Sequence, residues 1–269
     1  MREVKQVINE DLSKYNPEGS TLRKAQLRML DILIEVDKIC RMHNIDYFLD
    51  CGTLLGAVRH GGFIPWDDDL DIAIKSEDLP RLRKALQEEL PADFCYQDRT
   101  TDWNYFMTIG KVRDKKSIFN DPYFKRTKEK GIYIDIFLVE PVVPLWLRNS
   151  IDFVYIRCLR GIHNYSDHLL EKILGYVCYI PAVIAMMACR GIAKIFNSNK
   201  YGRSYGFKSV MYVNKDVLFP VREIEFEGYT FMAPNDTDAL LKNFYGNYMQ
   251  IPPEDKRITH LAEITFFDE

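Results

Sequence analysis

The sequence lacks a strong excess of either charge. Its 36 basic and 39 acidic residues give a formal net charge of -3 at pH 7. Proteins that bind nucleic-acid backbones usually carry a clear excess of lysine and arginine, at least on one face. We therefore expect no nucleic-acid partner.

Cysteine pairs with metal-binding spacing are also missing. The six cysteines show no C-x-x-C motif, and most lie among apolar residues, so we expect reduced thiols that pack in the core. The N-terminal stretch lacks the apolar run of a signal peptide. These absences predict a cytoplasmic protein, at the inner face of the cytoplasmic membrane if its apolar segment contacts lipid.

What the sequence does contain is typical of a folded chain. Of its 269 residues 47% are hydrophobic, and 16 Tyr with 16 Phe argue against disorder. Apolar spacing and turn residues predict an α+β core over residues 1–140. The helices expected there cover about 21–42, a short segment from Cys51, and 77–90 with Ser76 as its cap; the strands cover about 46–50, 70–74, 94–97, 104–113 and 131–139.

Residues 141–210 read as a mainly helical insertion. It contains 17 consecutive uncharged residues, 173–189, with Pro181 among them. A packed helix pair, a surface that rests on a membrane and a true membrane span are all compatible with this run, in that order of preference. Residues 211–269 return to mixed structure, with a hairpin turning at Glu227-Gly228 and a helix that ends at Gly246.

The stretch HGGFIPWDDDLDIAI, residues 60–74, places four aspartates beside a strand. Alternation directs Leu70, Ile72 and Ile74 into the core and puts Asp69 and Asp71 on the other face, roughly 6–7 Å apart. Two carboxylates so close repel each other unless a cation lies between them. Mg²⁺ or Mn²⁺, which prefers oxygen ligands, would supply that compensation.

Two further features point to phosphate chemistry. Gly52-Thr53 precedes a helix and offers a backbone amide and a hydroxyl to a phosphate. Asp135 is an isolated acid in the apolar strand GIYIDIFLV. Each feature alone has a plain structural explanation: a solvated acidic loop, an ordinary turn, or a hydrogen-bonded aspartate. Together they match the parts of a two-metal phosphoryl-transfer site.

The segment DYFLDCGTLLGAVRHGGFIPWDDDLDIAI closely resembles the signature of the LicD family, the choline-phosphotransferase and fukutin-type branch of the nucleotidyltransferase superfamily. IGKVRDKKSIF, GIYIDIFLVEPV and the C-terminal FMAPNDTDALLKNFYGNYMQIPPEDKR extend the similarity more loosely. The resemblance implies a polymerase-β-like nucleotidyltransferase core with an added helical segment. It also implies that Asp69, Asp71 and Asp135 are the catalytic, metal-binding acids.

The implied reaction moves a phospho-alcohol group such as phosphocholine from a CDP-alcohol to a hydroxyl of a cell-surface glycan or its lipid-linked precursor, releasing CMP. Asp135 would share a metal or accept the proton of the attacking hydroxyl. Asp67 and Asp68 are expected in a supporting loop, with Asp68 facing away from Asp69 and Asp71. A lipid-linked acceptor would give residues 173–189 a reason to contact a membrane.

Five other residues are candidates for the donor site. Lys111 and Arg113 could neutralise phosphate charge or form a solvated strand face. Arg59 and His60 could contact the donor or cap a helix. Trp66 could stack on a base or quaternary ammonium, although a loop anchor explains it equally well.

Three functions other than a phosphotransferase are alternatives for this sequence. An antibiotic-type nucleotidyltransferase would use the same acids with an NTP. A glycosyltransferase could use Asp-x-Asp, but it gives no reason for Gly52-Thr53 or Asp135. A non-catalytic scaffold in glycan assembly would not need the acids at all.

Overall fold

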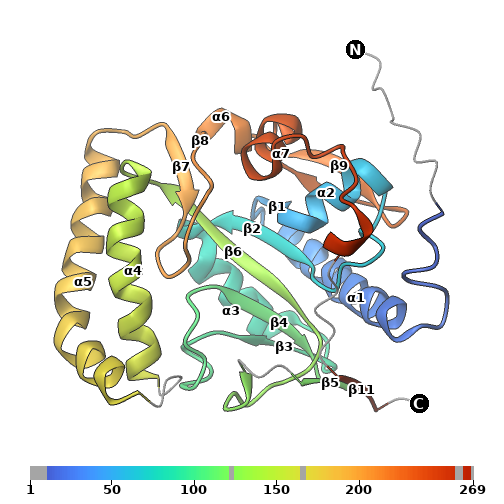
Figure 1. Cartoon of the computed structure of the whole chain (residues 1–269), viewed down its shortest axis with the longest axis horizontal. Helices are drawn as coiled ribbons and strands as arrows, with labels where there is room; N and C mark the ends of the chain where they lie inside the picture. Colours follow the sequence, from blue (N-terminus) through green and yellow to red (C-terminus); the bar gives the residue numbers. More distant parts are fainter. Residues whose placement is uncertain (1–10, 121–123, 164–167, 258–262, 268–269) are drawn as a thin grey trace.

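The protein has an α+β fold in the computed structural model, which describes residues 11–120, 124–163, 168–257 and 263–267. Figure 1 shows a central sheet with helices around it and one helix pair at the side. The elements are α1 (Thr21–Met42), β1 (Tyr47–Leu49), α2 (Cys51–His60), β2 (Asp71–Lys75), the 3-10 turn η1 (Ser76–Asp78), α3 (Leu79–Glu89), β3 (Phe94–Gln97), β4 (Gly110–Asp114), β5 (Ser117–Asn120), β6 (Tyr133–Pro141), α4 (Leu145–Ile162), α5 (Leu169–Ile195), β7 (Lys200–Arg203), β8 (Val213–Asn214), α6 (Lys215–Leu218), β9 (Arg222–Phe226), β10 (Tyr229–Ala233), α7 (Thr237–Tyr245), the 3-10 turn η3 (Glu254–Lys256) and β11 (Glu263–Phe266).

The main sheet has the strand order β1-β2-β6-β4-β3, and β7 also pairs with β6 and with β8. The long strand β6 organises it, because β2 runs parallel to it on one side. On the other side β4 pairs with its first half and β7 with its second half, both antiparallel. Strand β7 therefore joins the main sheet, although it falls in the range predicted as mainly helical.

Periodicity predicted most of these elements correctly. Ser20 caps α1 through its hydroxyl, and the predicted apolar positions of that helix are buried. Leu70, Ile72 and Ile74 are buried as alternation requires, and Gly246 ends α7. One strand was predicted too long: β4 begins at Gly110, not near residue 104. The carboxylates of Asp98 and Asp102 accept hydrogen bonds from nearby backbone amides and fold that segment into turns.

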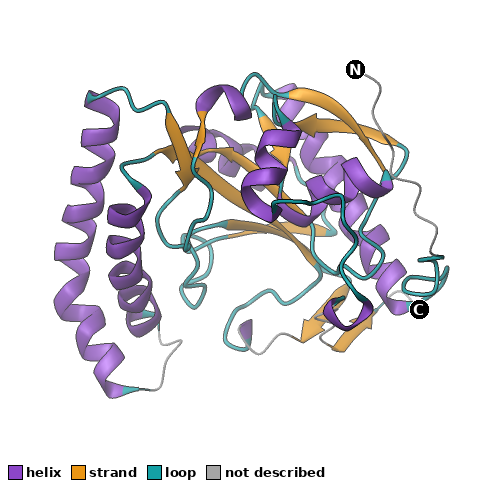
Figure 2. Ribbon diagram, turned by 45° about the horizontal axis from the view of Figure 1, so that its top comes forward, coloured by secondary structure: helices purple, strands orange, loops and turns teal. Residues whose placement is uncertain are grey.

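Helices α4 and α5 pack side by side at one end of the sheet in both views (Figures 1 and 2). Their shared interior is a separate small cluster that includes Tyr155, Leu159, Ala182 and Met186. Most of the other buried hydrophobic side chains form one large core that joins α1, the sheet and the C-terminal elements. The outward face of α5 is largely exposed.

Candidate functional site

The pairing of β1, β2 and β6 brings acids from separate parts of the chain together at one end of these strands. Asp71 opens β2 and lies directly opposite Asp135 in the parallel β6. The backbone N–H of Asp135 donates to the carbonyl of Leu70, which fixes this register (2.9 Å). Asp50, at the end of β1, donates its own backbone N–H to the carbonyl of Asp71 (3.0 Å). The sheet thus gathers acids that are far apart in sequence.

The loop before β2 holds a tight acidic group. Carboxylate oxygens of Asp67, Asp68 and Asp69 all lie within 4.8 Å of one another. The prediction that Asp68 faces away was wrong, because β2 begins at Asp71 and strand alternation does not apply to the preceding loop. Gly52 permits this packing, since a Cβ there would lie 2.5 Å from Oδ2 of Asp67.

Crowding and burial disfavour the charged forms of these acids. Burial, with the charges of Asp69 and Asp68 adding to it, raises the pKa of Asp67 to about 7. Burial raises the pKa of Asp71 well above its usual range, and Asp135 and Asp69 add to the shift. A divalent cation held by carboxylate oxygens would reverse both effects. The residues present therefore fit Mg²⁺ or Mn²⁺.

Lys111 is the cation already beside Asp135. Its Nζ lies 2.5 Å from Oδ1 of Asp135 and 3.3 Å from the ring centroid of Tyr133. Burial lowers the pKa of Lys111, and the attraction of Asp135 opposes that shift. The ammonium group is placed to orient Asp135 and to face the adjacent cavity.

A cavity of about 430 Å³ opens next to these groups, and Asp69, Lys111 and Asp135 line it. Phe106, Phe124 and Tyr133 form apolar walls, while Arg160 and Lys208 add positive charge. A pocket of this kind suits a ligand with both an anionic and an apolar or aromatic part. It is the cavity that the acids can reach.

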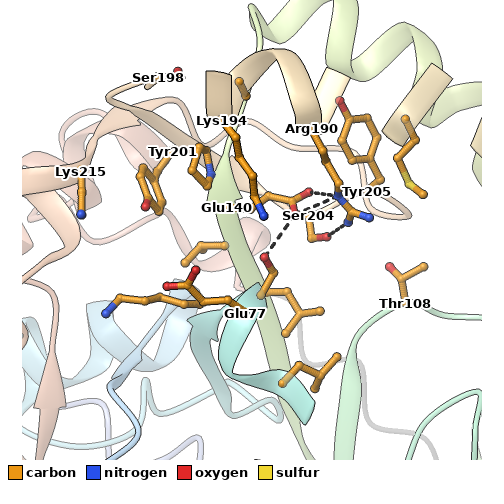
Figure 3. Close-up of a pocket in the computed structure, with 18 of the residues that line it drawn as sticks. Glu77, Thr108, Glu140, Arg190, Lys194, Ser198, Tyr201, Ser204, Tyr205 and Lys215 are labelled. Carbon is orange, nitrogen blue, oxygen red and sulfur yellow. Dashed lines mark hydrogen bonds and ion pairs between the residues drawn. The ribbon is translucent and has the colours of Figure 1, made fainter. Parts of the chain in front are cut away.

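A larger cavity, of about 1000 Å³, lies toward the other end of β6 (Figure 3). There Arg190 of α5 donates to both carboxylate oxygens of Glu140 (3.0 Å each) and to the hydroxyl of Ser204 (2.8 Å). None of the predicted catalytic acids lines this cavity. Asp69 and Asp135 line the smaller one.

Residues 44–155 match the family model described as "LicD/FKTN/FKRP, nucleotidyltransferase domain". The chain therefore contains a LicD domain. It is 27% identical to the lipopolysaccharide cholinephosphotransferase LicD of Haemophilus influenzae, over 90% of this chain and 97% of that protein. A 35-residue stretch, 13% of this chain, is 54% identical to the ribitol 5-phosphate transferase FKRP of Homo sapiens and covers 7% of that protein.

One predicted phosphate ligand of the LicD domain, Thr53, has another partner. The hydroxyl of Thr53 is buried and accepts a hydrogen bond from the backbone N–H of Asp71 (2.8 Å). It therefore positions Asp71, in place of the phosphate contact that the sequence suggested. Gly52 keeps its predicted place beside the acids.

Arg113 is likewise a structural residue of the LicD domain. Its Nε donates to Gln97 (2.5 Å), one terminal nitrogen donates to the carbonyl of Gly131 (2.8 Å), and its side chain is 1% exposed. Arg113 does not line the cavity beside the acids, and its guanidinium joins β4 to the Gln97 side chain and to the backbone at Gly131 in place of the predicted phosphate contact. Lys111 and Arg113 do share a face, since both lie over the ring of Tyr133.

Trp66 anchors the acidic loop against Tyr15 and Arg257. Its side chain is buried, the ring of Tyr15 meets it edge-on at 5.3 Å, and the guanidinium of Arg257 lies 5.1 Å from its centroid. The faces that a base or ammonium group would need are thus already covered. Of the two interpretations of Trp66, the packing anchor is correct.

Arg59 and His60 interact with each other at the end of α2. Arg59 donates from Nε to Nε2 of His60 (2.9 Å) and from a terminal nitrogen to the carbonyl of Tyr248 (2.9 Å). Neither residue lines the cavity beside the acids. The pair joins α2 to the C-terminal segment, which gives it a structural part in place of the predicted donor contact.

This arrangement predicts a pH dependence of stability. Burial and the adjacent Arg59 lower the pKa of His60 from 6.5 to about 4. Between these values the unfolded chain binds a proton that the native state does not, so the free energy of unfolding should fall as pH drops from 6.5 toward 4. In His60→Gln this contribution, on the order of 1–2 kcal/mol for a partly exposed ring, should disappear.

Urea unfolding of both proteins at pH 7 and pH 5 measures the effect. The wild type should lose more stability over this interval than His60→Gln. Equal losses would show that His60 titrates normally in the native state.

Arg203, outside the matched LicD range, is a site residue that the sequence did not reveal. It forms a buried ion pair with Asp50, and a terminal nitrogen lies 3.1 Å from Sγ of Cys51. Its guanidinium also lies 4.2 Å from the ring centroid of Phe137. Arg203 supplies fixed positive charge behind the acids. The sequence around Arg203 does not indicate this role, because its partners Asp50 and Cys51 lie more than 150 positions away.

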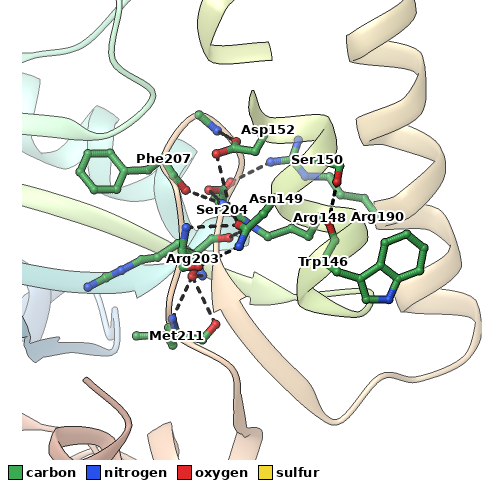
Figure 4. Close-up of polar contacts among 12 residues, drawn as sticks. Trp146, Arg148, Asn149, Ser150, Asp152, Arg190, Arg203, Ser204, Phe207 and Met211 are labelled. Atoms are coloured by element: carbon green, nitrogen blue, oxygen red, sulfur yellow. Dashed lines mark hydrogen bonds and ion pairs between the residues drawn. The ribbon is translucent and has the colours of Figure 1, made fainter. Parts of the chain in front are cut away.

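The loop that follows Arg203 is held by α4 (Figure 4). Arg148, 0% exposed, donates to the carbonyls of Arg203 (3.1 Å), Ser204 (2.5 Å) and Phe207 (2.8 Å). Asp152 accepts from the backbone N–H of Gly206. Since Phe207 and Lys208 line the smaller cavity, α4 positions one of its walls.

Proposed function

We propose that this chain is a metal-dependent phosphotransferase that moves a phospho-alcohol group from a CDP-alcohol to a hydroxyl of a cell-surface glycan or its lipid-linked precursor. The observation that carries the proposal is the meeting of Asp69, Asp71 and Asp135 beside a 430 Å³ cavity. Similarity to a cholinephosphotransferase and to a ribitol 5-phosphate transferase supports the same reaction class. Phosphocholine is the first candidate for the transferred group.

The proposal includes a polymerase-β-like nucleotidyltransferase core over residues 1–140. The helical segment 141–210 would carry one wall of the site, and residues 211–269 would pack on the core. The register of Asp71 and Asp135 supports such a core, since it puts two acids side by side near the starts of the parallel strands β2 and β6. The proposed location is the cytoplasm.

Asp69 and Asp71 would hold Mg²⁺ or Mn²⁺, with Asp67 close enough to contribute. The bound ion would supply charge neutralisation for the donor diphosphate. Lys111 pairs with Asp135 through its Nζ and orients the carboxylate. Asp135 can then accept the proton of the acceptor hydroxyl, whose oxygen forms the new bond to phosphorus as the bond to CMP breaks. CMP leaves with the electron pair of that bond.

The apolar and aromatic walls of the cavity suit the non-phosphate part of the donor. Phe106, Phe124 and Tyr133 offer apolar contact area to a base or to the methyl groups of a quaternary ammonium group. Arg160 and Lys208 supply further charge for phosphate oxygens. These residues replace Trp66, Thr53 and Arg113 as the proposed donor contacts.

A donor screen tests the proposal. CMP release would be measured with CDP-choline, CDP-ethanolamine, CDP-glycerol and CDP-ribitol, each with Mg²⁺, with Mn²⁺ and with EDTA. ATP and CTP serve as controls. We expect one CDP-alcohol to be used in a metal-dependent manner. Pyrophosphate release from an NTP, with no CDP-alcohol used, would indicate a nucleotidyltransferase of the antibiotic type, and turnover of no donor would indicate a scaffold.

A further inference from the structure

The outward face of α5 is a continuous apolar stripe. Six side chains at helical spacing are each more than half exposed: Ile173, Tyr176, Val177, Ile180, Ile184 and Met187. No charged residue occurs between Lys172 and Arg190. At 1.5 Å per residue, this uncharged stretch is about 25 Å long. Large exposed apolar patches of this kind usually mark interaction surfaces.

Helix α5 is not a core helix, because only 22% of its most apolar 18 residues is buried. Its length and composition would allow it to cross a membrane, but its packing argues against a span. Its other face, with Ala182, Met186 and Cys189, packs in the cluster shared with α4. Arg190 is also bonded to Glu140 of β6. The helix is therefore fixed along the side of the molecule, with its apolar face directed outward.

The charges near the apolar face of α5 indicate what this face would contact. Among the basic residues of α4 and α5, Arg157, Lys172 and Lys194 are at least partly exposed, whereas Arg148 is buried and Arg190 is paired with Glu140. Lys172 and Lys194 flank the stripe at its two ends. Trp146 of α4 is also exposed. Basic ends, an apolar middle and exposed aromatics are the pattern of helices that lie in the interface of anionic membranes.

We propose that α5 lies flat on a bilayer containing anionic lipids, with Ile173 to Met187 inserted at the boundary of head groups and acyl chains. Lipid fits better than a second protein copy, because the stripe offers no hydrogen-bonding side chain except the Tyr176 hydroxyl. Protein interfaces carry about one hydrogen bond per 100–200 Å². This inference stands on the surface alone and does not depend on the proposed chemistry.

Vesicle flotation of the full chain tests the proposal. Vesicles of phosphatidylcholine alone and of phosphatidylcholine with phosphatidylglycerol would be compared, with the wild type, Ile180→Glu/Ile184→Glu and the control Leu27→Glu/Met42→Glu. The control makes the same change at exposed positions of α1. We expect binding to the anionic vesicles that falls at least about tenfold in the α5 variant and is unchanged in the control.

Circular dichroism would show that each variant is folded, and size-exclusion chromatography with light scattering would report the oligomeric state. Three results would overturn the proposal. The wild type could fail to float with either vesicle, or the α5 variant could float as well as the wild type. A wild-type dimer that the α5 variant converts to a monomer, without vesicle binding, would assign the stripe to a second copy.

Discussion

Replacing Asp69 or Asp71 by asparagine should reduce CMP release by about 1000-fold or more. Each change removes one negative charge from the proposed cation site and replaces a strong oxygen ligand by a weak one. The geometry should survive, because asparagine has nearly the same shape. Initial rates with the donor chosen by the screen, at saturating Mg²⁺, measure the loss.

The same substitutions should leave the metal-free protein at least as stable as the wild type. Burial and neighbouring carboxylates raise the pKa of Asp71, which means that its charge is unfavourable in the native state without a cation. Removing that charge relieves the repulsion. Thermal unfolding in EDTA, with and without added Mg²⁺, separates loss of function from loss of fold. The wild type should gain stability from Mg²⁺, and Asp71→Asn should gain less.

Asp46→Asn is the matched control. Asp46 precedes β1, is half exposed and pairs with Lys75 at 3.1 Å, away from the acidic group. It should keep nearly full activity. Normal activity in Asp69→Asn or Asp71→Asn would remove the acids from the reaction and favour a scaffold.

The sequence allowed the acidic part of the site to be predicted because strands obey simple rules. Alternation placed Leu70, Ile72 and Ile74 in the core, so β2 could be located to within one residue from the stretch 70–74. An isolated acid in an apolar strand, Asp135, is expected to meet a metal, a cation or a backbone donor, and its pairing with Lys111 agrees with that expectation. Its register opposite Asp71 could not be derived, because local pattern does not give the order of the strands.

The residues that were misjudged are those whose partners lie far away in sequence. Arg113 and Thr53 looked available because a sequence does not show what covers a side chain. Their partners, Gln97 and the backbone of Asp71, become neighbours only when the sheet forms. Asp68 was misplaced for a different reason: strand alternation was extended into a loop.

The helix pair has two separate connections to the rest of the molecule. Arg148 of α4 holds the backbone of the loop that carries Arg203 and Phe207, and Arg190 of α5 holds Glu140 at the far end of β6. A membrane bound to α5 would therefore be joined to the smaller cavity through packed helices, the hydrogen bonds of the buried Arg148 and the Arg190–Glu140 ion pair. This arrangement would hold the cavity at a fixed distance from the lipid surface, as a lipid-linked acceptor requires.

Arg203→Met should lower the free energy of unfolding by about 3–5 kcal/mol. The change leaves Asp50, which is 0% exposed, as an uncompensated buried charge next to Asp71. Methionine fills much of the same volume, so the loss should come from electrostatics and not from a cavity. The double variant Asp50→Asn/Arg203→Met should recover most of the stability, because it removes the stranded charge while Oδ1 of residue 50 can still cap α2.

Urea unfolding of the two single variants and the double variant gives the coupling energy of the pair. Lys242→Met is the control, since it breaks an exposed ion pair of 2.7 Å with Asp238 and should cost less than about 1 kcal/mol. A similarly small loss for Arg203→Met would mean that Asp50 takes up a proton or a water instead. Turnover adds a second readout: if Arg203 only supports Asp50, the double variant should be active as well as stable. If the positive charge itself helps to hold the acids in their ionised form, the double variant should fold normally and still require a higher Mg²⁺ concentration than the wild type.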